Sequence, residues 1–176
     1  MINHSNIKDE DYFSLFDMNR EYLLDSDFLE KRYFELQKEY HPDKFVGKNE
    51  GERLDGIKKS TLINDAYKAL KSPLKRAEYI LSLNGIVVND EQNTIKPNQE
   101  ILLEAMEQRE ALLNAEKEEE LNEIDVSNKE KRDVCIKDLE KSFDNNELEK
   151  AAELAIKLRY IEKFAEEIKL KKSKIL

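Results

Sequence analysis

The residues best suited to chemistry or to specific contact in this sequence are His41, Pro42 and Asp43. An imidazole and a carboxylate stand two positions apart, and the proline between them restricts the backbone. A histidine beside an aspartate can act as a general base with its orienting partner if a nucleophile and a pocket lie near. Alternatively, an exposed carboxylate can bind a cationic group of a partner through a charge-assisted hydrogen bond. The other residues of the chain show which of these two interpretations, catalysis or binding, is better supported.

Catalysis is the weaker interpretation because the remaining catalytic groups are missing from the pattern. His4 and His41 are the only histidines, and neither fits a Ser-His-Asp or metal-ligand spacing. The single cysteine, Cys135, cannot form an intrachain disulfide and cannot hold an iron–sulfur cluster alone. It lies in a periodic helical segment, where a buried, apolar role is expected. We therefore expect a protein that is not an enzyme and has neither a metal site nor a cofactor.

The composition favours long solvated helices. Charged residues make up 39% of the 176 positions, whereas the chain has only 4 glycines and 3 prolines, the residues that punctuate β-structure. The net charge of −9 disfavours binding to nucleic acid, and no cationic membrane face or membrane-spanning run is evident. The first residues lack the pattern of a signal or transit peptide. These features predict a soluble, cytoplasmic, all-α protein.

Two helices must position the tripeptide. Residues 26–40 carry apolar side chains at steps of four, three and four, which is the spacing of one helix face: Leu29, Tyr33, Leu36 and Tyr40. Asp25 or Ser26 is suited to cap this helix, and Pro42 ends it. Residues 49–71 predict the second helix, with its own apolar side at Leu62, Ile63, Ala66, Tyr67 and Leu70. The tripeptide is thus expected on an exposed loop between two antiparallel helices.

Shorter helices are expected on either side of this pair. Residues 11–16 predict a short opening helix with core aromatic side chains. Ser72 and Pro73 are suited to begin a fourth helix, and Asn84 and Gly85 to end it. We predict a first domain over residues 9–84, a polar linker over residues 85–96, and a second domain over residues 97–172.

The sequence of the second domain predicts three helices, at about residues 98–120, 128–143 and 146–172. Ser127 and Glu130 have the spacing of a capping box, which sets the expected start of the middle helix. Asn146 and Glu149 repeat the same spacing before the last helix. That last helix carries a bundle-type apolar stripe: Ala151, Leu154, Leu158, Ile161, Ala165 and Ile168.

The first helix of this domain carries two apolar stripes. Ile101, Ala105 and Leu112 suffice to close a three-helix core. Leu102, Met106 and Leu113 lie about 100° away around the helix. Apolar surface beside Glu107 and Glu110 predicts a partner-binding face, although packing of this second stripe on the first domain or on a neighbouring helix is an equally open explanation.

Four segments together resemble the HscB/Jac-type branch of J-domain co-chaperones. They are residues 12–16 (Tyr-Phe-Ser-Leu-Phe), 41–45 (His-Pro-Asp-Lys-Phe), 63–67 (Ile-Asn-Asp-Ala-Tyr) and 74–81 (Leu-Lys-Arg-Ala-Glu-Tyr-Ile-Leu). The Gly/Phe-rich segment and the paired CxxC repeats of general DnaJ chaperones are both missing from the sequence. The resemblance implies an N-terminal J-domain, an antiparallel helical hairpin with short flanking helices, joined to a C-terminal three-helix bundle.

The resemblance also implies partners and the residues that bind them. The tripeptide would dock on a DnaK-class ATPase, here HscA, and stimulate its ATP hydrolysis. The candidate chaperone-binding residues are His41, Pro42, Asp43, Arg32, Lys38 and Lys44. The second domain would bring the iron–sulfur scaffold protein IscU to that chaperone, so that ATP turnover drives cluster transfer. The candidate scaffold-binding residues are Leu102, Leu103, Met106, Glu107, Glu110, Arg159 and Tyr160.

Two other readings of the same pattern stay open. The chain could be a general J-domain adaptor that delivers another client to DnaK, or a structural adaptor whose tripeptide has lost its role. The basic residues near the loop could equally be an ordinary solvated face: Arg32, Lys38, Lys44 and Lys48.

Overall fold

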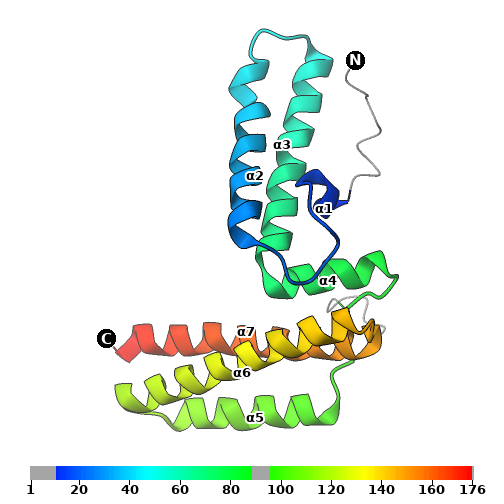
Figure 1. Ribbon diagram of the computed structural model, residues 1–176. Coiled ribbons are helices and arrows are strands. Elements are labelled where there is room, and N and C mark those ends of the chain that lie inside the picture. The colour runs from blue at the N-terminus through cyan, green and yellow to red at the C-terminus, as the bar shows by residue number, and fades with distance from the viewer. Residues whose placement is uncertain (1–10, 89–95, 176) are drawn as a thin grey trace. The chain divides into compact units, whose positions relative to one another are not determined.

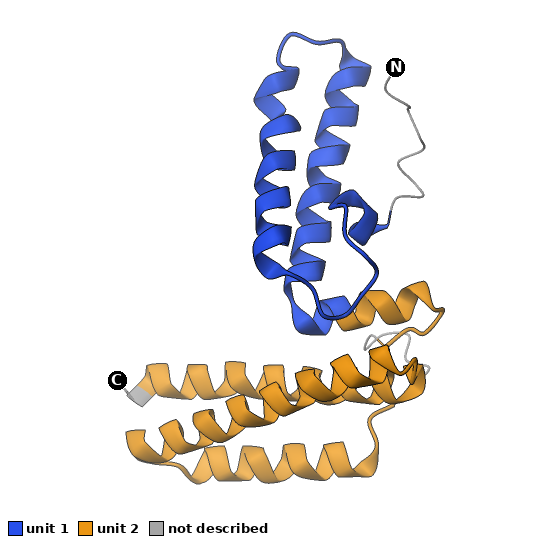
Figure 2. Ribbon diagram, in the orientation of Figure 1, with its two compact units in different colours: residues 1–76 blue, residues 77–176 orange. Residues whose placement is uncertain are grey.

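The computed structural model describes residues 11–88 and 96–175, and every regular element in these ranges is helical. His4 and most of the predicted linker lie outside the described residues. The chain divides into two compact units, residues 1–76 and 77–176, so that the division falls within one helix, α4 (Figure 2). The all-α prediction is confirmed for the described residues.

The first unit is built on a helical hairpin. Helix α2 (Ser26–Glu39) and helix α3 (Glu50–Lys71) lie side by side, and the short helix α1 (Tyr12–Leu15) packs on α3 (Figure 1). Each start is capped by a side chain, with Asp11, Asp25 and Asn49 accepting backbone N–H groups at the beginnings of α1, α2 and α3. The predicted aromatic core is present, since Phe13 and Phe16 are fully buried.

Proline ends α2 as expected, but the loop that follows it is ordered into a turn. A 3-10 helix, η1 (Pro42–Phe45), begins at the proline, whose missing N–H is not needed at the first helical position. The loop reverses at Gly47, which has a φ of +86°. Helix α4 (Pro73–Leu83) then begins at the predicted proline, with the Ser72 hydroxyl oxygen accepting the N–H of Lys75 at 3.3 Å.

The second unit packs three long helices: α5 (Gln99–Asn114), α6 (Glu118–Asp144) and α7 (Leu148–Ile175), which lie side by side in Figure 1. α6 and α7 form the most extensive pair, and α5 packs on them through the buried side chains of Ile101, Ala105 and Leu112. Leu112 belongs to a small core with Ala115, Leu121, Phe164 and Ile168. The core stripe predicted for α5 is therefore confirmed.

Three predicted boundaries in this unit are wrong. Helix α5 ends at Asn114, six residues before the predicted end at about residue 120. Ser127 lies within α6 rather than at its start, because the helix begins nine residues earlier, at Glu118. The break between α5 and α6 instead depends on Glu120, whose carboxylate accepts the N–H groups of Glu116 at 2.9 Å and Lys117 at 3.2 Å. Asn146 does not cap α7 either: its φ of +57° marks the left-handed residue that follows α6.

None of the helices in the described part of the chain is both long and apolar enough to cross a bilayer.

Candidate partner-binding sites

The tripeptide is held in a short turn at the end of the α2–α3 hairpin. The Lys44 N–H donates to the His41 carbonyl oxygen at 2.9 Å, and the Asp43 N–H donates to the His41 imidazole Nδ1 at 3.3 Å. The His41 and Asp43 side chains are 55% and 86% exposed, with Nδ1 3.5 Å from the carboxylate. His41 thus shapes the turn through its ring nitrogen, while the carboxylate of Asp43 projects into solvent.

The turn is attached to α3 by an aromatic side chain. The ring of Phe45, the last residue of η1, lies directly on the backbone of α3 at Gly56. The Nζ of Lys48 lies 5.1 Å from the centroid of that ring, within cation–π range. The presentation of Asp43 therefore depends on a contact between the loop and the helix.

The two helices behind the turn are joined by a polar link across their interface. The amide oxygen of Asn64 on α3 accepts the Tyr33 hydroxyl and the Gln37 amide of α2, both at 2.9 Å. The rings of Tyr33 and Tyr67 stack with centroids 3.9 Å apart. Asn64 and Tyr67 both belong to the segment that carries the family resemblance, and these contacts give them a role in aligning α2 with α3.

The predicted cationic residues around the turn differ in their surroundings. The Arg32 guanidinium is paired with Asp17 and with Glu35, and its hydrogen bond to Glu35 raises its pKa. Lys38 and Lys44 are exposed. Arg32 therefore contributes to the fold of the first unit, and the two lysines are more available to a partner.

The second apolar stripe of α5 is exposed. The exposed fractions are 42% for Leu102, 69% for Met106 and 78% for Leu113, and Leu103 is also exposed at 59%. Glu107 and Glu110 lie beside them and are exposed as well. Together with Leu113, the predicted scaffold-binding residues of α5 thus form one apolar, acid-bordered surface, which we call the α5 patch.

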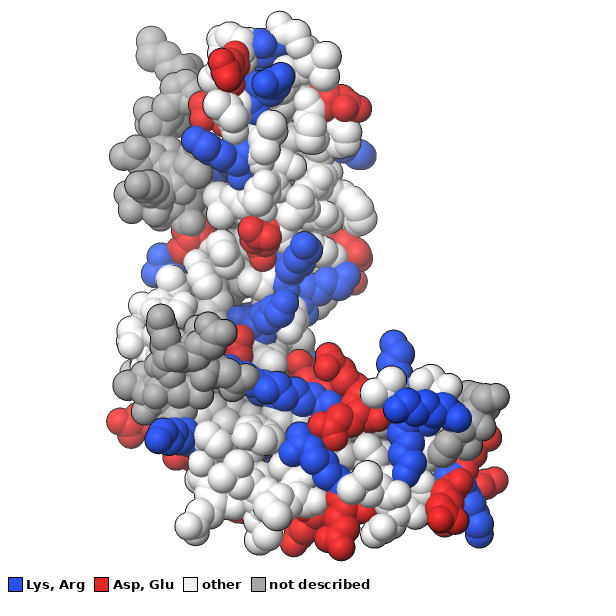
Figure 3. Space-filling model, turned by 180° about the vertical axis from the view of Figure 1, so that it is seen from behind, with Lys and Arg blue, Asp and Glu red and all other residues white. Residues whose placement is uncertain are grey.

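Charged side chains hold α5 against the other two helices. Glu104 accepts hydrogen bonds from Lys131 of α6 at 2.6 Å and is 3.2 Å from the Nζ of Lys157 of α7. At the end of α5, the Lys171 ammonium donates to the carbonyl oxygens of Leu112 and Leu113. Basic and acidic side chains lie next to one another over the face of this unit seen in Figure 3. The sequence patterns did not reveal these links, because they join residues distant in the chain.

The two candidate residues on α7 are in different settings. The Arg159 side chain is only 11% exposed and is paired with Glu78 of α4 and with the Val88 carbonyl oxygen, all within the second unit. Tyr160 is partly buried and close enough to the Arg109 guanidinium of α5 to affect it electrostatically. Tyr160 therefore adjoins α5, whereas Arg159 organises the interior of its own unit.

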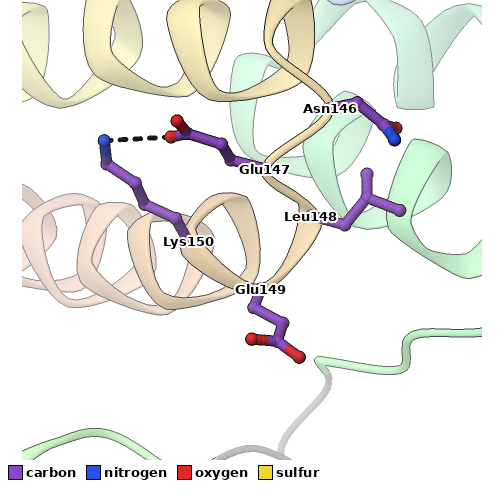
Figure 4. A pocket seen from close by; sticks show the side chains of 5 residues that line it. All are labelled: Asn146, Glu147, Leu148, Glu149 and Lys150. Atoms are coloured by element: carbon purple, nitrogen blue, oxygen red, sulfur yellow. Dashed lines mark hydrogen bonds and ion pairs between the residues drawn. The ribbon is translucent and has the colours of Figure 1, made fainter.

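The hollows of the described surface hold no reactive constellation. One is lined by residues 146–150 at the turn into α7, where Glu147 and Lys150 point toward each other with 3.1 Å between their charged atoms (Figure 4). A second lies beside Cys135, which is buried and whose thiol pKa is raised to about 11 by burial. Among the described residues, no group of three histidine, cysteine or acidic side chains could hold a metal ion.

Known protein families match both units. The DnaJ domain model matches residues 11–79, and the model described as HSCB C-terminal oligomerisation domain matches residues 97–169. The iron–sulfur cluster co-chaperone protein HscB of Mus musculus is 39% identical over 163 residues, covering 93% of this chain and 69% of the relative. Its Homo sapiens counterpart is 40% identical over 162 residues, covering 92% and 68%.

Solved structures agree with this match. The crystal structure of human co-chaperone HscB superposes with a TM-score of 0.88 at 38% identity, covering 93% of this chain and 83% of the human chain. Chaperone HscB from Vibrio cholerae gives a TM-score of 0.85 at 34% identity, covering 95% and 100%.

A DnaJ domain followed by a bundle of three helices defines a J-domain co-chaperone, a class that is not enzymatic. Within that class, the chain belongs to the HscB family of iron–sulfur cluster co-chaperones.

Proposed function

We propose that this chain stimulates the ATPase of an HscA-type chaperone and delivers the iron–sulfur scaffold protein IscU to it. A DnaJ domain implies an Hsp70-class partner, and membership of the HscB family suggests HscA and IscU. The observation that carries the proposal is the geometry of Asp43, whose carboxylate is 86% exposed on a turn that is tied to α3. Such a carboxylate is free to meet an arginine of the ATPase in a charge-assisted contact.

The α5 patch supports the second half of the proposal. It offers apolar side chains of low rigidity, including Met106, at the centre and carboxylates at the edge, the arrangement of a protein-binding surface. Its acidic border and the chain's net charge of −9 favour a partner with basic residues around an apolar surface.

The ATPase half is tested by measuring stimulation of two purified chaperones, HscA and a general DnaK, each with and without IscU. Stimulation of HscA that increases with IscU is expected. Asp43→Asn keeps the side-chain volume but removes the charge, so it should abolish stimulation and leave the fold intact. Asp55→Asn, at an exposed position on α3, is the matched control and should stimulate normally. Full stimulation by Asp43→Asn would refute the role of this carboxylate. Stimulation of DnaK without any effect of IscU would favour the general adaptor.

The delivery half is tested by calorimetric titration with IscU. Replacing Leu102, Leu103 and Met106 together by serine should abolish IscU binding, while stimulation measured without IscU stays near normal. The matched control replaces Val126 and Val134, which are exposed apolar residues of α6, by serine. Unchanged affinity of the triple variant would remove the α5 patch from the interface.

A further inference from the structure

Helix α3 carries a glycine in its interior, and the helix alone does not explain it. Gly56 lies between Asp55 and Ile57, well inside Glu50–Lys71, and it has no positive φ that would require the absence of a side chain. Glycine at such a position weakens a helix relative to alanine, because it loses more backbone freedom on folding. The residue is buried, so the explanation must lie in what packs against it.

The ring of Phe45 occupies the space that a side chain at Gly56 would need. A Cβ built on Gly56 would lie 2.7 Å from both Cδ2 and Cε2 of the ring, and 2.8 Å from Cγ. Non-bonded carbon atoms normally approach to about 3.5–4.0 Å. Because Cγ, the ring atom nearest the backbone, is part of the contact, turning the ring about its own axis cannot relieve the overlap, and the whole ring would have to leave α3 by a new rotamer or by movement of the loop.

Phe45 is directly connected to the tripeptide. It is the last residue of η1, and the turn continues through the N–H of Val46, which donates to the Asp43 carbonyl oxygen at 3.3 Å. A displacement of the Phe45 ring away from α3 would therefore remove the attachment of the turn that contains Asp43.

We infer that Gly56 is a positioning residue for the tripeptide: its missing side chain lets Phe45 sit on α3, and Phe45 in turn fixes the turn that presents Asp43. The inference rests on the proposed function of Asp43 and adds a residue that the tripeptide pattern does not contain. On this inference, Gly56 makes α3 less stable than alanine would, and in return the binding loop is held in the orientation that presents Asp43.

The test is Gly56→Ala, compared with Gly51→Ala as a matched control in the same helix. At Gly51 the nearest atom to an added Cβ is the Asn49 Oδ1 at 3.4 Å, an ordinary contact. Both substitutions favour the helix, so helix content by circular dichroism should be kept in both. Gly56→Ala should lower ATPase stimulation at sub-saturating concentration by at least about tenfold, because a displacement of about 1 Å can have effects of that size. Gly51→Ala should leave stimulation near that of the wild type.

Two further measurements separate positioning from general damage. In Gly56→Ala, backbone order parameters from NMR should fall at residues 43–46 and remain unchanged in the second half of α3. Phe45→Ala, which removes the ring together with its Cγ, should also lower stimulation. Adding Gly56→Ala to Phe45→Ala should then cause no further loss, because the atoms that the new Cβ would overlap are already gone.

Several results would overturn the inference. One is wild-type stimulation by Gly56→Ala, and another is an equal further loss when Gly56→Ala is added to Phe45→Ala. Loss of helix content in Gly56→Ala would show a structural role instead. If the wild-type protein stimulates no chaperone, the proposed function fails, and the order parameters alone decide: unchanged values at residues 43–46 would reject the positioning role, whereas lower values would retain it.

Discussion

Arg109 on α5 and Glu167 on α7 form a two-pronged ion pair. The Arg109 Nε lies 3.1 Å from each carboxylate oxygen of Glu167, and Nη2 lies 2.9 Å from Oε1. The hydrogen bond to Glu167 raises the pKa of the Arg109 guanidinium. Arg109 stands between Met106 and Leu113 in the sequence, so this pair attaches the middle of the α5 patch to α7.

Reversing this pair should affect scaffold binding through the placement of α5. Arg109→Glu faces Glu167 with a like charge, and we expect the affinity for IscU to fall by roughly fivefold, because a half-exposed ion pair contributes about 1 kcal/mol or less. The double variant Arg109→Glu with Glu167→Arg restores the opposite charges and should recover most of the affinity. Calorimetric titration of the two variants gives the comparison. An equal loss in both would mean that Arg109 contacts the partner itself.

Glu104 makes the attachment of α5 sensitive to acid. Burial raises the pKa of its carboxyl group, but the hydrogen bonds and positive charges of Lys131 and Lys157 outweigh burial, so the pKa lies below its usual value of 4.5. A carboxyl group whose pKa is lower in the folded state stabilises the fold above the unfolded pKa. This contribution is lost as the pH falls through the folded pKa.

The variant Glu104→Gln isolates that contribution. We expect the wild type to be more stable than the variant by up to about 1 kcal/mol between pH 5 and 7, with the difference shrinking below about pH 4.5. Urea denaturation followed by circular dichroism at a series of pH values measures it. A difference that stays constant down to pH 3 would contradict the assignment.

Local patterns in the sequence predict the helices, but not all of their ends. Pro42, Pro73 and Gly85 act locally, through backbone geometry, and the elements that they delimit are found where expected. The helix start predicted at Ser127 is wrong because a serine and a glutamate at capping-box spacing also fit within a continuous helix. Packing on α7 stabilises the interior of that helix. The break near Glu116 carries no proline or glycine, so the sequence offers no strong signal for it.

The candidate sites were also predictable only where their signals are local in the sequence. The tripeptide is recognisable from residue types alone. The second apolar stripe of α5 follows from helical periodicity, but periodicity does not say whether the stripe is exposed, which the structure shows. The contact of Phe45 with Gly56 joins the loop to a helix that follows it in the chain. The spacing of apolar residues within a helix cannot predict a contact of this kind. An interior glycine in an otherwise regular helix was the one sequence signal that could have drawn attention to it.

Cys135 is expected to be chemically inert in the folded protein. Burial raises its thiol pKa from 9.0 to about 11, and the thiol donates a hydrogen bond to the Leu154 carbonyl oxygen at 3.4 Å. The thiolate is the reactive form, so two pKa units reduce its population roughly a hundredfold. Alkylation by iodoacetamide at pH 8, followed by mass spectrometry, should be at least that much slower in native protein than in urea. Comparable rates would show that the thiol is accessible.

Ser142 on α6 is a site where the fold should tolerate, and benefit from, losing a polar group. The side chain is fully buried, and its hydroxyl has no hydrogen-bond partner among the described residues. A buried hydroxyl without a partner loses its hydration and gains nothing in return. Alanine also has the higher helix propensity. We expect Ser142→Ala to raise the free energy of unfolding by about 1 kcal/mol, measured by urea denaturation.

The matched control for this substitution is Ser127→Ala, at an exposed position in the same helix. Ser127→Ala gains the helix propensity of alanine without removing a buried polar atom, so it should stabilise the protein by only a few tenths of a kcal/mol. The difference between the two variants therefore isolates the cost of burying the hydroxyl. If Ser142→Ala stabilises no more than Ser127→Ala, the Ser142 hydroxyl is satisfied in solution, and an internal water held between α6 and α7 becomes the explanation to test.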